Sequence, residues 1–163
     1  MFDQVGDSVK AQLMTIGYEG ANIADFIATL QASNVTTLID VRELPLSRKK
    51  GFSKNKLRQQ LEESGIAYLH VKQLGDPKPG RLAARAGNMN EFRRIFGDHI
   101  KLDATREALQ EVVPVIEAGG ACLLCFERCH SDCHRSIVAD ELAKLADFEL
   151  AHIGVKQGIA KQH

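Results

Sequence analysis

Short, mostly apolar segments alternate with amphipathic segments along this chain. The apolar segments are four to seven residues long and cover residues 13–16, 35–41, 66–71, 121–126 and 149–153. Near-continuous apolar runs of this length are typical of strands covered on both faces, and their alternation with helices indicates a parallel sheet. We therefore predict an α/β fold: a single domain over residues 1–163, with a doubly wound, mostly parallel sheet of about five strands and helices on both faces.

Helix signals lie between the predicted strands. Asn22 and Ser53 are placed to cap two helices, because apolar residues follow each of them at helical spacing. Two more helices are expected over residues 89–96 and 103–116. Pro114 should kink the second of these or end it early, because proline lacks the backbone N–H that a helix needs.

The remaining segments give weaker signals. Residues 73–88 hold two prolines and three glycines, and we predict a long loop there. Ser131 or Asp132 should cap the helix that follows the fourth predicted strand. A polar tail begins at about residue 155.

The charges of the chain balance, with 21 acidic and 21 basic residues. The whole molecule is therefore not a polycation drawn to nucleic acid or to anionic membranes, and any electrostatic recognition must come from local clusters. No apolar run approaches the roughly 20 residues that cross a bilayer, and the first residues, MFDQVGDSVK, lack the order of a signal peptide. We expect a cytoplasmic protein with no membrane partner, whose cysteines are thiols rather than disulfides.

Polar side chains stand where the predicted strands end. Tyr18 follows the first strand, Asp40 and Arg42 end the second, and His70 closes the third. Glu127 opens the turn after the fourth strand. Ligands of such folds bind beyond the carboxyl ends of the strands, so we expect these side chains to converge on one site. The guanidinium of Arg42 is suited to hold an anion there through two hydrogen bonds.

Basic residues concentrate in two segments near the same edge. Residues 42–54 include Arg42, Arg48, Lys49, Lys50 and Lys54, and residues 78–94 include Lys78, Arg81, Arg85, Arg93 and Arg94. These residues are either solvated surface charges or the contact surface of a nucleic-acid-binding module. The sequence leaves both interpretations open.

All four cysteines lie within residues 122–136, CLLCFERCHSDCHRS. Four thiolates would suit zinc or an iron–sulfur cluster. On a strand, however, Cys122 and Cys125 project to opposite faces and cannot bind one ion, so we expect both in the core and predict no metal and no cofactor. A partial metal site within one tight turn stays as an alternative, made by Cys129, His130, Cys133 and His134.

A second interpretation makes Cys129 a nucleophile. Five residues separate it from Arg135-Ser136, which is the spacing of the phosphate-binding loop in cysteine-dependent phosphatases and arsenate reductases. That chemistry needs a thiolate ringed by backbone amides and an arginine on the oxyanion. The loop has no glycine to turn its amides inward, and Asp132 would place a negative charge where the anion should bind.

A third interpretation centres on Cys133-His134-Arg135 in the first turn of a helix. Free amides and the helix dipole would favour an anion or a thiolate there. Arg135 would bind the anion, and the pKa of Cys133 would be lowered. His134 would donate or accept a proton, with Glu127 orienting either side chain.

Four motifs in order resemble a known family: TIGYEG at 15–20, LIDVRELPLSRKKGFSK at 38–54, GIAYLHVKQLG at 65–75 and LLCFERCHSDCHRSIVADEL at 123–142. The chain is similar here, over about residues 15–145, to family 488 of the domains of unknown function. The resemblance implies an α/β domain and a shared polar site without a defined reaction. By motif position it adds Ser47 to the site and retains Asp40, Arg42, Cys133, His134 and Arg135.

The functional expectation is a site for a small phosphorylated or otherwise anionic ligand, such as a nucleotide or a nucleic-acid end. Arg42 and Arg135 would hold the charge, and Tyr18, Asp40, Ser47 and His70 would line the cleft. Cys133, His134 and Glu127 would provide any chemistry. A non-catalytic nucleic-acid-binding module using residues 42–54 and 78–94 is the first alternative, and the Cys129 phosphatase is the second. The sequence gives no oligomeric state.

Overall fold

The computed structural model describes residues 10–130 and 133–162. Five strands form one sheet in the order β3-β2-β4-β1-β5, and every neighbouring pair is parallel. The strands are β1 (Ala11–Gly17), β2 (Thr37–Asp40), β3 (Ala67–His70), β4 (Ala121–Cys125) and β5 (Phe148–Gly154). The predicted doubly wound, parallel α/β fold is confirmed.

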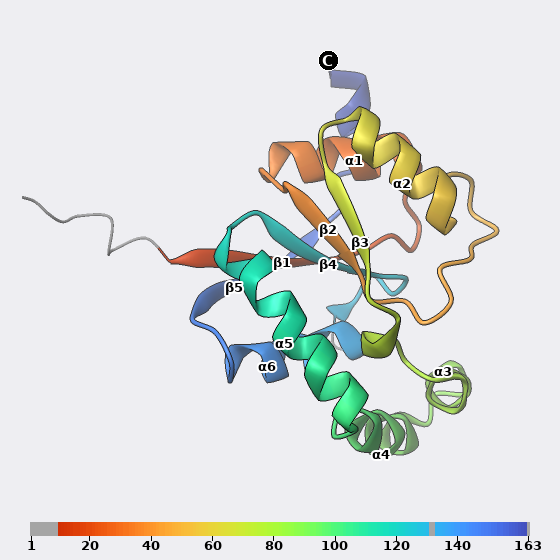
Figure 1. The fold of residues 1–163 in the computed structure, drawn as a ribbon. Coiled ribbons are helices and arrows are strands. Elements are labelled where there is room, and N and C mark those ends of the chain that lie inside the picture. Colours follow the sequence, from red (N-terminus) through yellow and green to blue (C-terminus); the bar gives the residue numbers. More distant parts are fainter. Residues whose placement is uncertain (1–9, 131–132, 163) are drawn as a thin grey trace, which may run out of the picture.

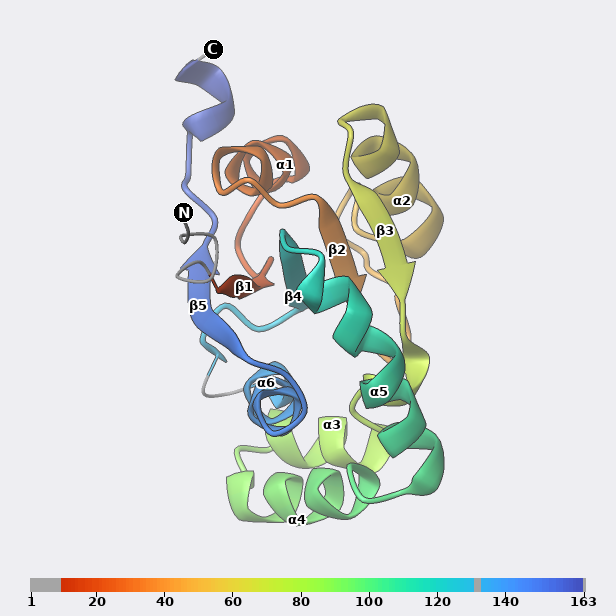
Figure 2. The same ribbon diagram turned by 60° about the vertical axis from the view of Figure 1, so that its left-hand side comes forward.

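Helices cover both faces of this sheet. They are α1 (Ile23–Ala32), α2 (Lys54–Glu63), α3 (Lys78–Arg85), α4 (Met89–His99), α5 (Asp103–Glu117) and α6 (His134–Ala143), with short 3₁₀ helices η2 (Lys72–Leu74) and η4 (Ile159–Gln162). Helices α1 and α2 lie on one face and α5 and α6 on the other (Figure 1). Helices α3 and α4 lie beyond the end to which the arrowhead of β3 points (Figure 2).

Each face of the sheet has its own apolar core. Phe26 and Leu57, from α1 and α2, pack with residues of one face, and Phe96 and Leu109, from α4 and α5, pack with residues of the other. Cys122 belongs to the first core and Cys125 to the second. The prediction that these two cysteines project to opposite faces of β4 is therefore confirmed.

The predicted long loop over residues 73–88 is wrong, because α3 occupies half of it. Pro77 is the N-cap residue of α3 and Pro79 lies in its first turn, where the missing backbone N–H has no helical partner to lose. Ala83 and Ala84 then favour the helix. The prolines start this helix rather than preventing one.

The structure also revises two predicted helix ends and confirms a third. Helix α5 continues three residues beyond Pro114 to Glu117, so this proline does not end the helix early. Ser131 and Asp132 lie outside the described residues, and the N-cap of α6 is Cys133, whose Sγ accepts a hydrogen bond from the Arg135 backbone N–H at 3.5 Å. Asn22 caps α1 as predicted, through a 2.8 Å bond from the Asp25 N–H.

The polar tail packs back onto α1. The backbone N–H groups of Gly158 and Ala160 donate to the two carboxylate oxygens of Asp25, at 2.8 and 3.1 Å. Ile159 is buried between them. Among the described residues, no helix combines the length and the apolar character that crossing a membrane requires.

Candidate functional site

A pocket of about 870 Å³ opens at the carboxyl edge of the sheet. Its lining comes from the segments after β1, β2 and β4, from α3 and the turn into α4, and from the start of α6. The predicted site residues in this lining are Tyr18, Arg42, Ser47, Glu127 and His134. The other predicted residues contact the lining from behind, namely Asp40, His70, Cys133 and Arg135.

A buried ion pair fixes Arg42 at the floor of the pocket. Its Nε and Nη2 donate to the two carboxylate oxygens of Asp40, at 2.9 and 2.7 Å. Its Nη1 donates to Tyr18 Oη at 3.1 Å and to the Phe52 carbonyl at 2.7 Å. Burial alone would lower the pKa of Arg42, but the hydrogen bonds and charge of Asp40 raise it above its ordinary value. Arg42 is therefore a permanent cation with most of its donors already used.

Asp40 has a second partner and no access to solvent. The hydroxyl of Tyr68 donates to Asp40 Oδ2 at 2.6 Å. Burial, together with the Asp40 charge, raises the pKa of Tyr68, so this phenol stays protonated. Asp40 orients Arg42 and does not reach the pocket itself.

Two histidines hold the backbone that follows β2. His134 Nε2 lies 2.6 Å from the Val41 carbonyl oxygen, and His70 Nε2 lies 2.7 Å from that of Arg42. A carbonyl only accepts hydrogen bonds, so both rings are Nε2–H tautomers. Burial lowers the pKa of His134 to about 4, which keeps the ring neutral. His134 can still face a ligand, because it lines the pocket.

Arg135 does not form the anion clamp with Arg42 that the sequence suggested. Its side chain is 1% exposed. Nε donates to Thr15 Oγ1 at 3.1 Å, Nη2 donates to the Arg128 carbonyl at 3.1 Å, and Nη1 bonds both the Glu127 carbonyl and Cys125 Sγ. The guanidinium therefore holds the turn after β4 in place, and its donors point into the protein.

The expectation of four thiols is also corrected. A disulfide joins Cys125 and Cys133, whose Cα atoms are 7.3 Å apart. Cys133 is buried, so an accessible Cys133 thiolate does not exist in this state. Cys122 stays a buried thiol, and burial raises its pKa. Cys129, the nucleophile of the phosphatase interpretation, is exposed and lies outside the pocket lining.

Three carboxylates that the sequence did not bring together line the pocket: Glu43, Asp76 and Glu127. Asp76 is 6% exposed, and its Oδ1 has no hydrogen-bond partner among the described residues. Burial, with the charges of Glu127 and Glu43, raises the pKa of Asp76 to about 7 although Arg81 opposes the shift. Burial also raises the pKa of Glu127.

Arg81 of α3 forms polar contacts with two of these three residues. It forms an ion pair with Glu43, and its Nη1 donates to the Asp76 backbone carbonyl at 2.7 Å. Gly80 leaves the space that Asp76 Oδ1 occupies, because a Cβ there would overlap that oxygen. In the sequence, Asp76 lies between Gly75 and Pro77, a pattern that indicates only a turn. Asp76 could be assigned to a site only from the position of α3, which begins two residues later.

The rim of the pocket combines exposed cations with apolar side chains. Lys78 and Arg85 are exposed on α3 and line the opening. Four of the exposed large apolar side chains surround the same opening: Leu44, Leu46, Leu82 and Phe126. Phe126 also stacks edge-on against Tyr18, with ring centroids 5.3 Å apart. A ligand with an apolar or aromatic body and a negative group would match this rim.

The side chain of Ser47 takes part in hydrogen bonds within its own loop. Its Oγ accepts from the Lys49 N–H at 3.0 Å, and the Ser53 hydroxyl bridges the Ser47 N–H and carbonyl at 3.1 Å each. Ser53 is the N-cap residue of α2, as predicted, but its hydroxyl serves this loop rather than the helix.

Gly17 lets β1 pass close to the turn that carries Glu127. A Cβ at Gly17 would overlap the Glu127 carbonyl oxygen and lie 2.9 Å from Arg135 Nη1. We expect Gly17→Ala to destabilise the protein by about 1–3 kcal/mol through overpacking, measured by urea denaturation. The matched control is Gly97→Ala in α4, where a Cβ meets nothing within 4 Å. It should stabilise the protein by about 0.5–1 kcal/mol through helix propensity; equal effects at the two sites would refute the close contact.

Comparison with known proteins places most of the chain in one family. Residues 22–142 match the family model described as Domain of unknown function DUF488. The matched range includes β2, β3, β4 and the pocket residues from Arg42 to His134. The same chain gave no match to a curated protein or to a solved structure.

Proposed function

Because the chain belongs to the DUF488 family, whose description names no reaction, we propose a function from the site: binding of a nucleotide, or a similarly anionic ligand with an aromatic body, in the pocket between the strand ends and α3. The observation that supports this most is the composition of the rim. Exposed apolar side chains, and cations with no ion pair to another described residue, surround one opening into a cavity of ligand size.

The apolar part of the ligand would rest on Phe126 and Leu82, which both line the opening. Phe126 is 45% exposed and Leu82 52% exposed, which is costly unless a partner covers them. A nucleobase has a planar face that stacks on an aromatic ring, with ring centroids about 4.5–7 Å apart in such pairs. Tyr18 supports Phe126 from the floor and keeps its ring in place.

The anionic part would bind Lys78 and Arg85. Arg42 is neutralised by Asp40 and Arg81 by Glu43, so these two residues of α3 are the cations best placed to meet a phosphate. Arg85 lines the pocket together with Lys78. Arginine can bind a phosphate through two parallel hydrogen bonds.

Asp76 supplies the acid–base chemistry in this proposal. Asp76 lines the pocket, its buried Oδ1 has no hydrogen-bond partner among the described residues, and a pKa of about 7 leaves the carboxyl divided between its two protonation states at neutral pH. A group in that range can both donate a proton to a bound ligand and accept one from it. The Cys133 chemistry expected from the sequence is not part of the proposal, since this sulfur lies behind the lining.

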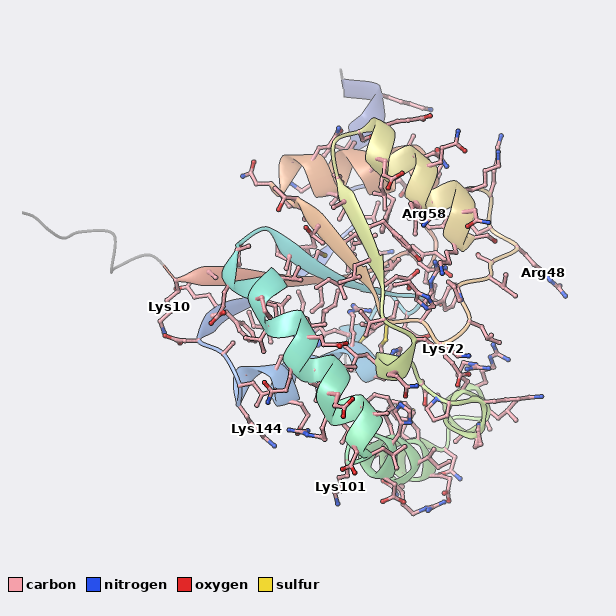
Figure 3. The ribbon with its side chains drawn as sticks, viewed as in Figure 1. Lys10, Arg48, Arg58, Lys72, Lys101 and Lys144 are labelled. Atoms are coloured by element: carbon pink, nitrogen blue, oxygen red, sulfur yellow. A yellow bond between two sulfur atoms is a disulfide. The ribbon has the colours of Figure 1, made fainter. Side chains whose placement is uncertain are left out.

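Removing the cation of Arg85 should weaken binding of a nucleoside monophosphate. A hydrogen bond to a charged group contributes about 1.5–3 kcal/mol, so Arg85→Gln should raise the Kd about tenfold to a hundredfold. The measurement is isothermal titration calorimetry with the four common nucleoside monophosphates. The matched control is Arg58→Gln, an exposed arginine on α2 (Figure 3) that is not among the residues lining the pocket, which should leave the Kd unchanged.

The corresponding nucleosides and inorganic phosphate separate the two halves of the site. A nucleoside should bind more weakly than its monophosphate in the unchanged protein and equally in wild type and Arg85→Gln. The proposal fails when none of the four monophosphates binds at millimolar concentration, or when the nucleosides bind as tightly as the monophosphates do.

A second candidate function is nucleic-acid binding, with a nucleotide of the strand entering the same pocket. Basic residues flank the opening on two sides: Arg48 and Lys50 are exposed in the loop after β2, and Lys78 and Arg85 are exposed on α3. Arg48 points away from the body of the molecule on the side where α3 lies (Figure 3). Affinity for an oligonucleotide would then fall steeply with salt, whereas that for a monophosphate would fall far less.

A further inference from the structure

We propose that the protein, once its Cys125–Cys133 disulfide is reduced, binds one zinc-like divalent ion through Cys125, Cys133 and His134, with Glu127 completing the site from the pocket side. This inference goes beyond the proposed function, because nucleotide binding at the rim needs no metal. It also differs from the four-cysteine site that strand geometry excludes: one cysteine comes from the end of β4 and the other ligands from the turn and the start of α6.

Three of the four proposed ligand atoms already lie close to one another, and the fourth, His134 Nδ1, lies close to one of them. The two sulfur atoms and a carboxylate oxygen of Glu127 are all within 4.8 Å of one another. Cys133 Sγ lies 3.6 Å from His134 Nδ1. With Zn–S of about 2.3 Å and Zn–N of about 2.0–2.1 Å, a sulfur and a nitrogen on one tetrahedral zinc ion are about 3.6 Å apart. The set Cys₂-His-Glu is of the kind that zinc prefers.

His134 is oriented as a metal ligand would be. Its Nε2–H donates to the Val41 carbonyl at 2.6 Å, which leaves the lone pair of Nδ1 directed toward Cys133. Histidines that bind a metal almost always donate their other ring N–H to a carbonyl or a carboxylate in this way. The tautomer and ring orientation are therefore set before any ion arrives.

The surroundings also suit two thiolates. Arg135 Nη1 donates to Cys125 Sγ at 3.0 Å, and the Arg135 backbone N–H donates to Cys133 Sγ at 3.5 Å. A guanidinium beside a sulfur favours the thiolate, which is the form that binds metal. This gives Arg135 a role that the anion-clamp hypothesis missed: it holds the two sulfurs rather than a ligand.

The backbone spacing fits a bridging ion. The Cα atoms of Cys125 and Cys133 are 7.3 Å apart, whereas disulfides usually join Cα atoms about 4.4–6.8 Å apart. Two sulfurs on one tetrahedral zinc ion lie about 3.7 Å from each other, given the Zn–S distance of about 2.3 Å. Reduction lets the sulfurs separate to that distance without bringing the two backbones closer.

A phosphine can reduce the Cys125–Cys133 disulfide before the metal ion is added. The phosphine attacks one sulfur, the S–S bond breaks, and water supplies the oxygen of the phosphine oxide and the two protons of the two thiols. When the ion binds, each thiol releases its proton to water and forms one S–metal bond. The disulfide and the metal site are thus mutually exclusive states of the same pair.

Cobalt(II) tests the proposal, since thiolate ligands give Co²⁺ an intense near-ultraviolet charge-transfer band. We expect the phosphine-reduced wild-type protein to bind about one equivalent of Co²⁺ with this band, and Zn²⁺ to displace it. Cys125→Ser and Cys133→Ser should each lose the stoichiometric band. The matched control is Cys122→Ala, which removes a buried thiol from the opposite face of β4 and should keep it.

Wild-type protein oxidised with a diazene dicarboxamide is the control that needs no substitution, because its pair is a disulfide and should give no band. The proposal is overturned when the reduced wild type shows no thiolate band, when the oxidised and reduced forms absorb alike, or when a folded Cys125→Ser variant keeps the band. Nucleotide titrations are independent of these spectra, so failure of the proposed function and failure of the metal site can be distinguished.

Discussion

Replacing Asp40 by asparagine is expected to cost about 3–5 kcal/mol of folding stability, because it leaves the buried guanidinium of Arg42 without a counter-charge. Asp40 has no solvent exposure and bonds both Nε and Nη2 of Arg42. Asparagine keeps the shape but supplies one neutral acceptor. Its amide NH₂ would also face either Arg42 or the hydroxyl hydrogen of Tyr68, both of which are donors.

Urea denaturation at pH 7 measures this effect, and Asp98→Asn is the matched control. Asp98 pairs with Arg94 at 3.7 Å on the surface of α4, where ion pairs contribute about 0–1 kcal/mol. The Asp98→Asn substitution should therefore change the urea concentration at the unfolding midpoint little. A loss below about 1 kcal/mol for Asp40→Asn would mean that Arg42 finds solvent or another anion, and that the rigid floor described for the pocket is wrong.

The elements of the fold could be predicted because their signals are local. Asn22 caps α1 and Ser53 begins α2, and each strand was recognisable from its own short apolar run. The convergence of Tyr18, Arg42 and Glu127 on one pocket follows from parallel topology, which brings the carboxyl ends of the strands to one edge.

What the sequence could not indicate is the direction in which a side chain points once its element is placed. Arg42 and Arg135 both come near the same edge, yet one reaches the pocket floor and the other turns back to the carbonyls of Glu127 and Arg128. The contact between Cys125 and Cys133 depends on how the intervening turn returns to the sheet. No periodicity encodes that path, and the expectation of thiols rested on the cytoplasmic assignment rather than on where the two cysteines lie.

Misreading residues 73–88 as a loop had the largest consequence for the site. Helix α3 contributes Lys78 and Arg85 to the rim and Arg81 to the acid cluster, and Asp76 immediately precedes it. Pro77 and Pro79 indicated a loop, although both lie at the N-terminus of the helix, where proline is tolerated. With Pro79 in the first turn, a helical assignment would have placed three cations on one short segment and suggested an anion site there.

Asp76→Asn is expected to stabilise the protein at alkaline pH and to change its stability much less at acidic pH. In the folded state the pKa of Asp76 is raised to about 7, whereas an unfolded aspartate titrates near 3.9. Between these values the folded protein holds a proton that the unfolded chain has lost, so stability falls as the pH rises through this window. Asparagine resembles the protonated acid and does not undergo this loss.

The expected gain for Asp76→Asn is on the order of 2–4 kcal/mol at pH 8, from about three pKa units at about 1.4 kcal/mol each, and only about 1 kcal/mol at pH 4.5, just above the unfolded pKa. Urea denaturation of both proteins at the two pH values measures it. Three charged groups act on Asp76: Arg81 of α3, Glu43 in the loop after β2, and Glu127 after β4. The comparison of the two proteins requires that the substitution leaves these three groups in place.

Asp147→Asn is the matched control for this pH dependence, since Asp147 is 82% exposed and pairs with Lys10 at 3.3 Å on the surface. Its effect should stay within about 0.5 kcal/mol at both pH values, as is usual for surface substitutions. Were Asp76→Asn to destabilise the protein equally at pH 4.5 and pH 8, Asp76 would be an ordinary ionised partner of Arg81. It could then not exchange a proton with a ligand near neutral pH, and the acid–base part of the proposed function would be lost while the rim contacts remained.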